Sequence, residues 1–143
     1  MEIVRDVKQY IIIRMDLGMS PGKLAAQASH SSMGVFFEKM SSEVVANNRN
    51  IQTEKDEFML YSFFANEDEH RWIENGFTKI VKKVKNESQL LKLYQQAVDK
   101  GLNVFLVKDA GLTELEGENY TALAIGPNKV SDCESIVKKL QNL

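Results

Sequence analysis

Residues 8–40 read KQYIIIRMDLGMSPGKLAAQASHSSMGVFFEKM, and this stretch predicts the first strand and the first helix of the fold. The run from Tyr10 to Ile13 is apolar and rich in β-branched residues, which is typical of a strand buried on both faces. Ser20-Pro21 is a strong helix-start signal, because the hydroxyl caps the helix and the missing proline N–H costs nothing in the first turn. We therefore expect a helix from Pro21 to about Met40 after a short loop.

Strand-like and helix-like segments alternate along the rest of the chain. Strands are expected at 77–84, 103–109 and 120–127, and helices at 66–76, at 86–101 and from 131 onward, where Ser131 and Glu134 have capping-box spacing. Residues 58–65 fit either a strand or a buried helical segment, and the polar stretch 41–57 is expected to contain a loop. This alternation predicts a layered α/β domain with a largely parallel sheet, and the short link between the last two strands predicts one antiparallel pair.

Length and composition limit the classes of protein that the chain can represent. A chain of 143 residues fits one domain, and no apolar run approaches the roughly 20 residues that span a bilayer. Cys133 is the only cysteine, so an internal disulfide is excluded and a reducing cytoplasm is the expected setting. The usual zinc frameworks are absent, and the net charge of −2 argues mildly against nucleic acid as a partner.

Lys23 occupies an unusual place, the first turn of the predicted helix. A cation there opposes the helix dipole at a cost of roughly 0.3–1 kcal/mol. Lys23, Gln27 and His30 fall within a stripe of roughly 60°, with Gly34 beneath them, and most other positions of the helix are small or apolar. We expect the helix to be buried around most of its girth. The polar stripe is then either its solvent-facing edge or a site where the ammonium and backbone N–H groups hold an anion.

A second group of polar residues lies at the end of the strand expected at 103–109. Asp109 ends that strand, where ligands of open α/β sheets gather, and Thr113 follows four residues later. The alternative is an Asx-type turn around Asp-Ala-Gly without chemistry. Arg14 and Asp16, at the end of the first strand, form either part of the same site or a local ion pair that orders the loop before Lys23.

Four segments together resemble the archaeal and eukaryotic type of peptidyl-tRNA hydrolase, the Pth2 family. They are IIIRMDLGMSPGKLAAQASHSS, KIVKKV, LYQQAVDKGLNVFLVKDAGLTEL and YTALAIGP, and they cover most of the chain outside the termini and 41–72. The resemblance implies a three-layer α/β/α domain over 1–143 with a four-stranded mixed sheet, no organic cofactor and no metal. It also implies hydrolysis of the ester that links a peptide to the 3′ end of tRNA, by a protein that is commonly a homodimer.

The resemblance also implies roles for individual residues. The family's catalytic positions fall on Lys23, Asp109 and Thr113, with Gln27 and His30 lining the same region. Arg14 is a further candidate for substrate binding. For the phosphate backbone of tRNA, the lysine-rich strand offers candidates, because phosphate contacts need no base reading. Its members are Lys79, Lys82 and Lys83, and the alternative for them is a solvated strand edge.

Three features depart from the family's pattern and keep other functions open. The family usually has an arginine at Leu112 and often a glutamine at Glu114, and both changes weaken the expected contact with a polyanion. The segment at about 41–72 is longer than usual and is interpreted as an insertion that covers the site, alters the substrate or mediates assembly. A catalytically silent binding module and a small hydrolase of another substrate are therefore the alternatives. The hydrolase hypothesis requires Lys23 and Asp109 to share one cleft.

Overall fold

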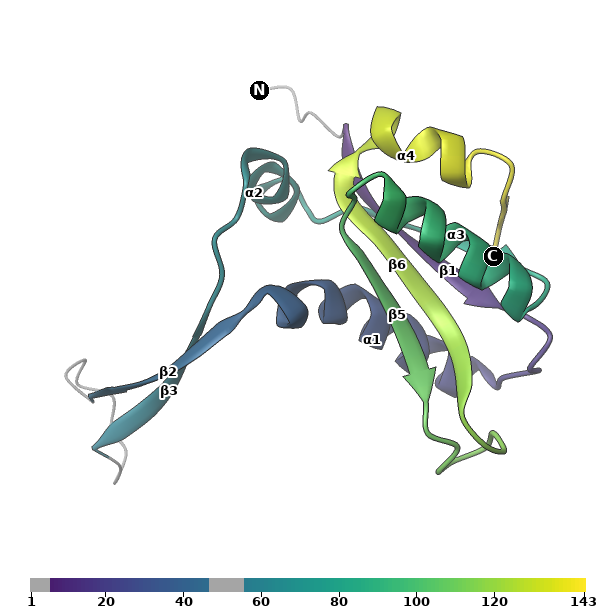
Figure 1. Cartoon of the computed structure of the whole chain (residues 1–143), viewed down its shortest axis with the longest axis horizontal. Coiled ribbons are helices and arrows are strands. Elements are labelled where there is room, and N and C mark those ends of the chain that lie inside the picture. The colour runs from purple at the N-terminus through teal and green to yellow at the C-terminus, as the bar shows by residue number, and fades with distance from the viewer. Residues whose placement is uncertain (1–5, 47–55) are drawn as a thin grey trace.

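Residues 6–46 and 56–143 are described in a computed structural model of the chain, which folds as a mixed α/β protein (Figure 1). The described strands are β1 (Val7–Arg14), β2 (Ser41–Ala46), β3 (Glu57–Ser62), β4 (Lys79–Val84), β5 (Val104–Asp109), β6 (Asn119–Lys129) and β7 (Gln141–Asn142). The described helices are α1 (Pro21–Lys39), α2 (Glu67–Glu74), α3 (Glu87–Asp99) and α4 (Val130–Val137).

The central sheet has five strands in the order β5-β6-β1-β4-β7, so the expectation of four strands is wrong. Only β1 and β4 pair in parallel, and the other three pairings are antiparallel, so a mostly parallel sheet is also wrong. The cause is β6, which turns back after β5 and lies between β5 and β1 with an antiparallel neighbour on each side. The antiparallel β5–β6 pair itself confirms what the short link predicts. The carboxyl ends of β1, β4 and β5 lie at one edge of the sheet.

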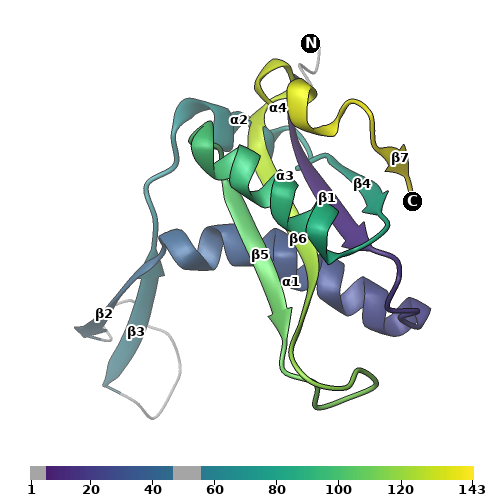
Figure 2. The ribbon, with the colours of Figure 1, turned by 45° about the vertical axis from the view of Figure 1, so that its right-hand side comes forward.

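Helices pack on both faces of this sheet (Figure 2). On one face, side chains of α3 and α4 join Ile12, Leu123 and Ile125 in the larger core. On the other face, Leu24 and Ala28 of α1 pack on Ile11 and Ile13. The alternation of the two sets along β1 follows from the two-residue period of a strand. It confirms the prediction that the apolar run of β1 is buried on both sides.

Strands β2 and β3 form a separate two-stranded hairpin that projects from the end of α1 (Figure 1). Of the two readings for residues 58–65, the strand is correct for the first part, because β3 covers Glu57–Ser62. Most of its side chains are exposed, so it is not a buried segment. The loop expected within 41–57 falls mainly on 47–55, outside the described residues. Segment 41–72 thus contains the hairpin and most of α2.

The helix starts follow local sequence signals in three of four cases. Ser20 and Asn86 accept a hydrogen bond from the third residue of their helices, and Asn66 forms a reciprocal capping box with Glu69. The capping box expected for the last helix is wrong, since α4 begins at Val130 without a side-chain cap. The reason is that β6 runs directly into α4, and the N–H of Val130 donates instead to the carbonyl of Asp6.

Candidate active site

The first turn of α1 brings Lys23 to the carboxyl end of β5. Its Nζ atom lies 2.5 Å from Oδ1 of Asp109 and 2.7 Å from Oγ1 of Thr113. The side chains of Lys23 and Asp109 are each 10% exposed. An ammonium carries three N–H donors, so these two partners leave one donor for another acceptor. The three residues predicted to be catalytic therefore lie together at one place on the surface.

The loop 110–118 shapes the acidic half of this site. Oδ2 of Asp109 accepts a hydrogen bond of 2.9 Å from the N–H of Gly111, so both carboxylate oxygens are engaged. Gly111 has a φ of 77°, and a Cβ atom there would lie 2.4 Å from the carbonyl oxygen of Gly117. Only glycine fits both constraints. The Asx-type turn was one of the two interpretations of this motif, and here the turn and the ion pair share the same carboxylate.

Glu114 has a role that the sequence pattern did not reveal. Its carboxylate accepts one hydrogen bond of 2.8 Å from the backbone N–H of Ser20 and another of 2.6 Å from the Ser20 hydroxyl. The loop is thereby fastened to the residue that caps α1. This carboxylate is a favourable partner for the positive end of the α1 dipole. Both carboxylate oxygens of Glu114 are therefore engaged by Ser20.

The polar stripe of α1 is divided between the sheet and the solvent, and the expectation that this helix is buried around most of its girth is wrong. Gln27 is buried and accepts a hydrogen bond from Thr121 on β6, and Gly34 packs so closely that a Cβ atom would lie 2.3 Å from the ring of Phe105. His30 is exposed. The opposite face of α1 is not buried, and it carries the exposed residues Ala25, Ala26, Ser29, Met33 and Phe37.

Arg14 is held by acids of its own chain. Its guanidinium binds both carboxylate oxygens of Asp16, at 2.7 and 3.1 Å, and also donates to Glu87 at 3.2 Å and to the carbonyl of Tyr120 at 3.3 Å. These contacts tie the loop after β1 to the start of α3 and to β6. The arrangement is the loop-ordering ion pair that the sequence offered as one of two interpretations.

The three lysines of β4 do not share one surface. Lys82 lies on the face of α3 and α4, where its ammonium donates to the carbonyl of Leu140. Lys79 and Lys83 lie on the other face, because successive residues of a strand alternate. The Lys79 ammonium sits 5.2 Å from the ring centroid of Trp72 and 4.6 Å from that of Phe77, and burial lowers the pKa of Lys79. Of the three, Lys83 is at the same edge of the sheet as Asp109.

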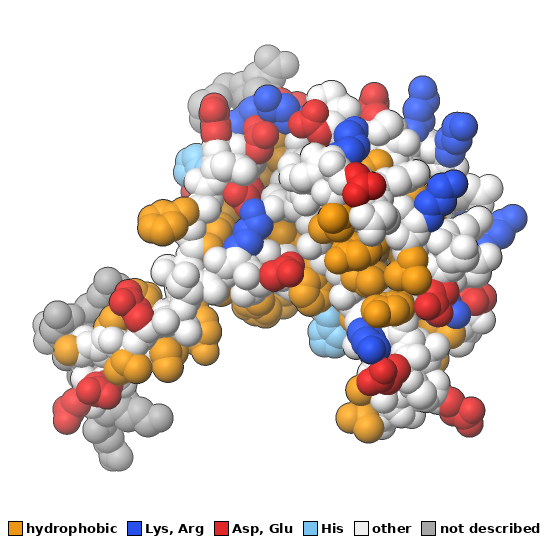
Figure 3. All heavy atoms as spheres, in the orientation of Figure 1, with side chains coloured by type: hydrophobic (Ala, Val, Ile, Leu, Met, Phe, Trp, Pro, Cys, Tyr) orange, Lys and Arg blue, Asp and Glu red, His pale blue; other side chains and the backbone are white. Residues whose placement is uncertain are grey.

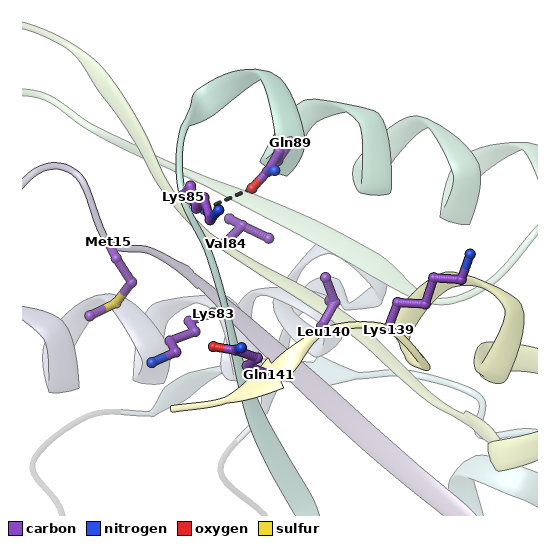
Figure 4. Close-up of a pocket in the computed structure, with 8 residues that line it drawn as sticks. All are labelled: Met15, Lys83, Val84, Lys85, Gln89, Lys139, Leu140 and Gln141. Atoms are coloured by element: carbon purple, nitrogen blue, oxygen red, sulfur yellow. Dashed lines mark hydrogen bonds between the residues drawn. The ribbon is translucent and has the colours of Figure 1, made fainter.

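Lys83 lines a cavity of about 460 Å³ at the carboxyl end of β4 (Figure 4). Lys85 and Lys139 also line it, together with Met15, Val84, Gln89, Leu140 and Gln141. The Lys83 and Lys139 side chains extend to opposite sides of Leu140 and Gln141, so their ammonium groups do not converge on one point. The cavity is basic, but it does not by itself form a cradle for a single anion.

The electrostatics of the site favour ionised carboxylates. The Lys23 ammonium and the Gly111 N–H lower the pKa of Asp109, and His30 adds a smaller effect in the same direction. The hydroxyl and N–H of Ser20 lower the pKa of Glu114.

Within 6–46 and 56–143, no cluster of three His, Cys, Asp or Glu side chains is placed to hold a metal ion. None of the helices described is long and apolar enough to cross a membrane.

Comparison with known proteins shows the family of the chain. The family description "Peptidyl-tRNA hydrolase PTH2" matches residues 7–143. The chain belongs to the PTH2 family. Similar proteins named peptidyl-tRNA hydrolase include that of Methanopyrus kandleri, 35% identical over 133 residues, covering 93% of this chain and 95% of the relative. That of Methanocaldococcus jannaschii is 31% identical over 137 residues, covering 96% and 100%.

A solved structure shows a fold like that of this PTH2 member. A protein of unknown function from Agrobacterium tumefaciens strain C58 superposes with a TM-score of 0.58 at 10% identity, covering 98% of this chain and 99% of that one. At this identity the likeness extends to the fold alone. The family match over residues 7–143 confirms the resemblance to the PTH2 family that the sequence motifs indicate.

Proposed function

We propose that this PTH2 member is a peptidyl-tRNA hydrolase, an enzyme that cleaves the ester between a peptide, or an N-blocked amino acid, and the 3′ end of tRNA. Family membership over residues 7–143 supports the reaction. The observation that carries the proposal is the contact of Lys23 with Asp109 and Thr113, because it assembles a charged, partly open site from elements 86 residues apart.

Lys23 has the electrostatic role in this mechanism. Water attacks the ester carbonyl, and negative charge develops on the carbonyl oxygen as the tetrahedral intermediate forms. The third N–H donor of Lys23 stabilises that oxygen, or a phosphate of the tRNA end, while its other two donors remain on Asp109 and Thr113. Fixed donors of this kind contribute about 10²–10³ in rate in other acyl-transfer enzymes.

Asp109 and Thr113 position the ammonium and the attacking water. Because Gly111 and Lys23 hold its two oxygens, the Asp109 carboxylate keeps one orientation and its negative charge. Thr113 is exposed and its hydroxyl both accepts from Lys23 and has a proton to donate toward the substrate. Gln27 supports α1 from beneath through Thr121, and His30 lies on the exposed rim of the same helix.

Phosphate contacts on the tRNA come from lysines near this edge of the sheet. Lys83 fits this role best of the three β4 lysines, since it lines the basic cavity at the carboxyl end of the strand. Lys79 and Lys82 already have aromatic and carbonyl partners, and their share in the contact is correspondingly smaller. Arg14 acts by holding the loop before α1.

The proposal extends to the setting of the enzyme. It comprises a single domain over 1–143 with an insertion at about 41–72, a three-layer α/β/α arrangement, a homodimer and a cytoplasmic location. Helices on both faces of the sheet support the layering. The exposed outer face of α1 supports a homodimer.

The contact of Glu114 with Ser20 bears on the alternative of a catalytically silent module. An acid facing a polyanion would favour that alternative, but Glu114 is engaged by Ser20. Release of the N-acetyl-amino acid from N-acetyl-aminoacyl-tRNA by the purified chain tests the proposal, with aminoacyl-tRNA bearing a free amine as the matched comparison substrate. Turnover that weakens steeply with salt is expected. Absence of turnover across the whole salt range would overturn the proposal in favour of a binding module.

A further inference from the structure

A second hollow adjoins the basic cavity at the carboxyl end of β4. It has a volume of about 450 Å³, and Lys92 and Gln96 of α3 and Ser135 of α4 are among the residues that line it. The two hollows share four lining residues and form one continuous surface: Val84, Gln89, Lys139 and Leu140. The two hollows together are called the lysine groove.

The lysine groove carries positive charge without acidic partners. Four lysines line it, and no Asp or Glu among the described residues does, although the chain has 20 acidic residues: Lys83, Lys85, Lys92 and Lys139. None of the ion pairs within 6–46 and 56–143 involves any of the four. Figure 3 shows Lys and Arg side chains projecting over α4 and the C-terminal end of the chain. A solvated surface usually mixes charges of both signs, so this groove is suited to an anionic partner.

The arrangement of the charges fits a chain of phosphates rather than one small anion. Lys83 and Lys139 extend to opposite sides of Leu140 and Gln141, so their charges are spread along the groove (Figure 4). The glutamine amides and the hydroxyl of Ser135 add groups of the kind that contact phosphate and sugar oxygens. A paired RNA arm presents phosphates and 2′-hydroxyls in succession along its length.

The shape of the groove argues against an anionic membrane as its partner. A protein that lies on a bilayer inserts exposed apolar side chains into it. The apolar side chains of Val84, Leu93 and Ile136 line the groove but are buried. A concave surface with charged rims and a buried apolar floor fits a rounded polyanion better than a flat one.

The lysine groove and the Lys23–Asp109 site lie at the same edge of the sheet. Val84 ends β4 and Asp109 ends β5, and these strands are three places apart in the strand order. Neighbouring strands lie about 4.8 Å apart, so the two strand ends are separated by about 14 Å. Phosphates of one stacked strand follow one another by about 3.4 Å along the axis, so about four nucleotides span this distance. The site and the groove can therefore contact different parts of one RNA.

The loop before α1 connects the groove to the site. Met15 lines the groove, and its N–H donates to the carbonyl of Val84 at 3.0 Å. The same loop leads directly into the first turn of α1. Asp16 and Glu87 flank this part of the groove, and the Arg14 guanidinium binds both and offsets part of their charge.

We propose that the lysine groove holds the paired arm of the substrate tRNA, behind its 3′ end, while Lys23 and Asp109 act on the ester. The inference rests on the proposed function for the identity of the RNA. Lys92 and Lys139 determine specificity for substrate length, because a short 3′ fragment that occupies the ester site does not reach them. The groove thus favours esters of whole tRNA over esters of short oligonucleotides.

Substrate length tests the groove through activity. Two N-acetyl-aminoacyl esters are compared, one of full-length tRNA and one of the trinucleotide CCA. The double variant Lys92→Gln with Lys139→Gln is expected to lower kcat/KM for the tRNA ester by about tenfold and to reduce the salt slope by about two, one for each lost phosphate contact. The trinucleotide ester should react as fast as with the wild type, which also shows that the variant is folded.

A matched control removes the same charge elsewhere. Lys8→Gln with Lys129→Gln changes two lysines at the opposite edge of the sheet, where the start of β1 pairs with the end of β6. This control should hydrolyse both esters as the wild type does. An equal loss on both esters in the groove variant, or equal losses in the two double variants, would overturn the proposal.

Binding of uncharged tRNA tests the groove without hydrolysis. Fluorescence anisotropy should show a dissociation constant about tenfold higher for the groove variant and unchanged for the control. An inactive wild-type chain that still shows this difference would refute the proposed function alone. Unchanged tRNA binding by the groove variant, with weaker binding to phosphatidylglycerol vesicles, would assign the groove to a membrane and contradict the proposal.

Discussion

Lys23 Nζ contacts Asp109 Oδ1 at 2.5 Å, so the first turn of α1 and the end of β5 meet at one ion pair. The pair explains why a lysine is tolerated at the positive end of a helix. The Asp109 carboxylate offsets the unfavourable interaction of the Lys23 charge with the helix dipole. A second carboxylate, that of Glu114, accepts hydrogen bonds from Ser20, the cap residue of the same helix. Asp109 ends β5 and Glu114 lies in the β5–β6 connection that follows it, so that connection controls the geometry of the site.

Glu114→Ala is expected to lower hydrolysis while leaving the fold intact. The substitution removes both hydrogen bonds to Ser20, and loop 110–118 then no longer holds Thr113 against Lys23. We expect a fall of about tenfold or more in kcat/KM, since small displacements at a site have large effects on rate. Glu116→Ala, at an exposed position of the same loop, is the matched control. Equal activities of the two variants would show that the contact with Ser20 has no role.

Gly34→Ala is expected to destabilise the protein by about 1–3 kcal/mol, the usual cost of overpacking. The added methyl group would lie 2.3 Å from the ring of Phe105, so α1 or the ring has to move. Urea unfolding measures the change. Phe105→Leu in the same chain should recover part of the loss, because the smaller side chain makes room. A Gly34→Ala protein as stable as the wild type would contradict this packing.

The fold should owe part of its stability to the Glu69 carboxylate of α2, which is 2% exposed and contacts Lys39 at the end of α1 and Asn103 just before β5. Burial raises the pKa of Glu69, but hydrogen bonds from Lys39 and from the Asn66 N–H outweigh it and leave the pKa lowered. Lys39→Met leaves this buried charge short of its cationic partner and should cost about 2–3 kcal/mol in unfolding. Lys85→Met, on the exposed turn before α3, is the control. A loss no larger than the control's would exclude a stabilising pair.

Stability should decline in acid with a contribution from the site. The folded pKa of Asp109 is lowered, so its stabilisation is complete above the unfolded value of about 3.9 and disappears as the pH falls through the folded pKa. Unfolding free energies measured from pH 3 to pH 7 should therefore fall less steeply below about pH 4 for Asp109→Asn than for the wild type. Parallel curves for the two proteins would mean that the carboxylate is not held by Lys23.

Local signals in the sequence were sufficient for some parts of the fold and insufficient for others. Tyr10–Ile13, Ser20 and Asn66 specify a strand and two helix starts by themselves, and Lys23 with Asp109 follows from the family motifs. The two-residue strand β7 has no periodic pattern to detect. The sequence also did not show which face of α1 packs on the sheet, because small residues occur on both faces and suit a buried face and an exposed one equally well.

Tertiary contacts also decided the roles of several charged residues. Glu114 was interpreted as a charge facing tRNA, but its partner Ser20 is 94 residues away, so no local pattern contains that contact. Lys79 and Lys82 belong to one lysine-rich run, yet the alternation of β4 places them on opposite faces. In each case the folded chain itself supplies the partner of the charged group: a hydroxyl for Glu114, an aromatic ring for Lys79 and a carbonyl for Lys82.

A double-mutant cycle between Lys23 and Asp109, measured as single-turnover hydrolysis of N-acetyl-aminoacyl-tRNA, tests the central claim most directly. Lys23→Met and Asp109→Asn should each lower the rate by about 10²–10³, and the double variant should be little slower than either, because the two groups act as one unit. Circular dichroism of each variant confirms the fold. Hydrolysis at the wild-type rate by either folded single variant would contradict the claim that this ion pair is the catalytic centre.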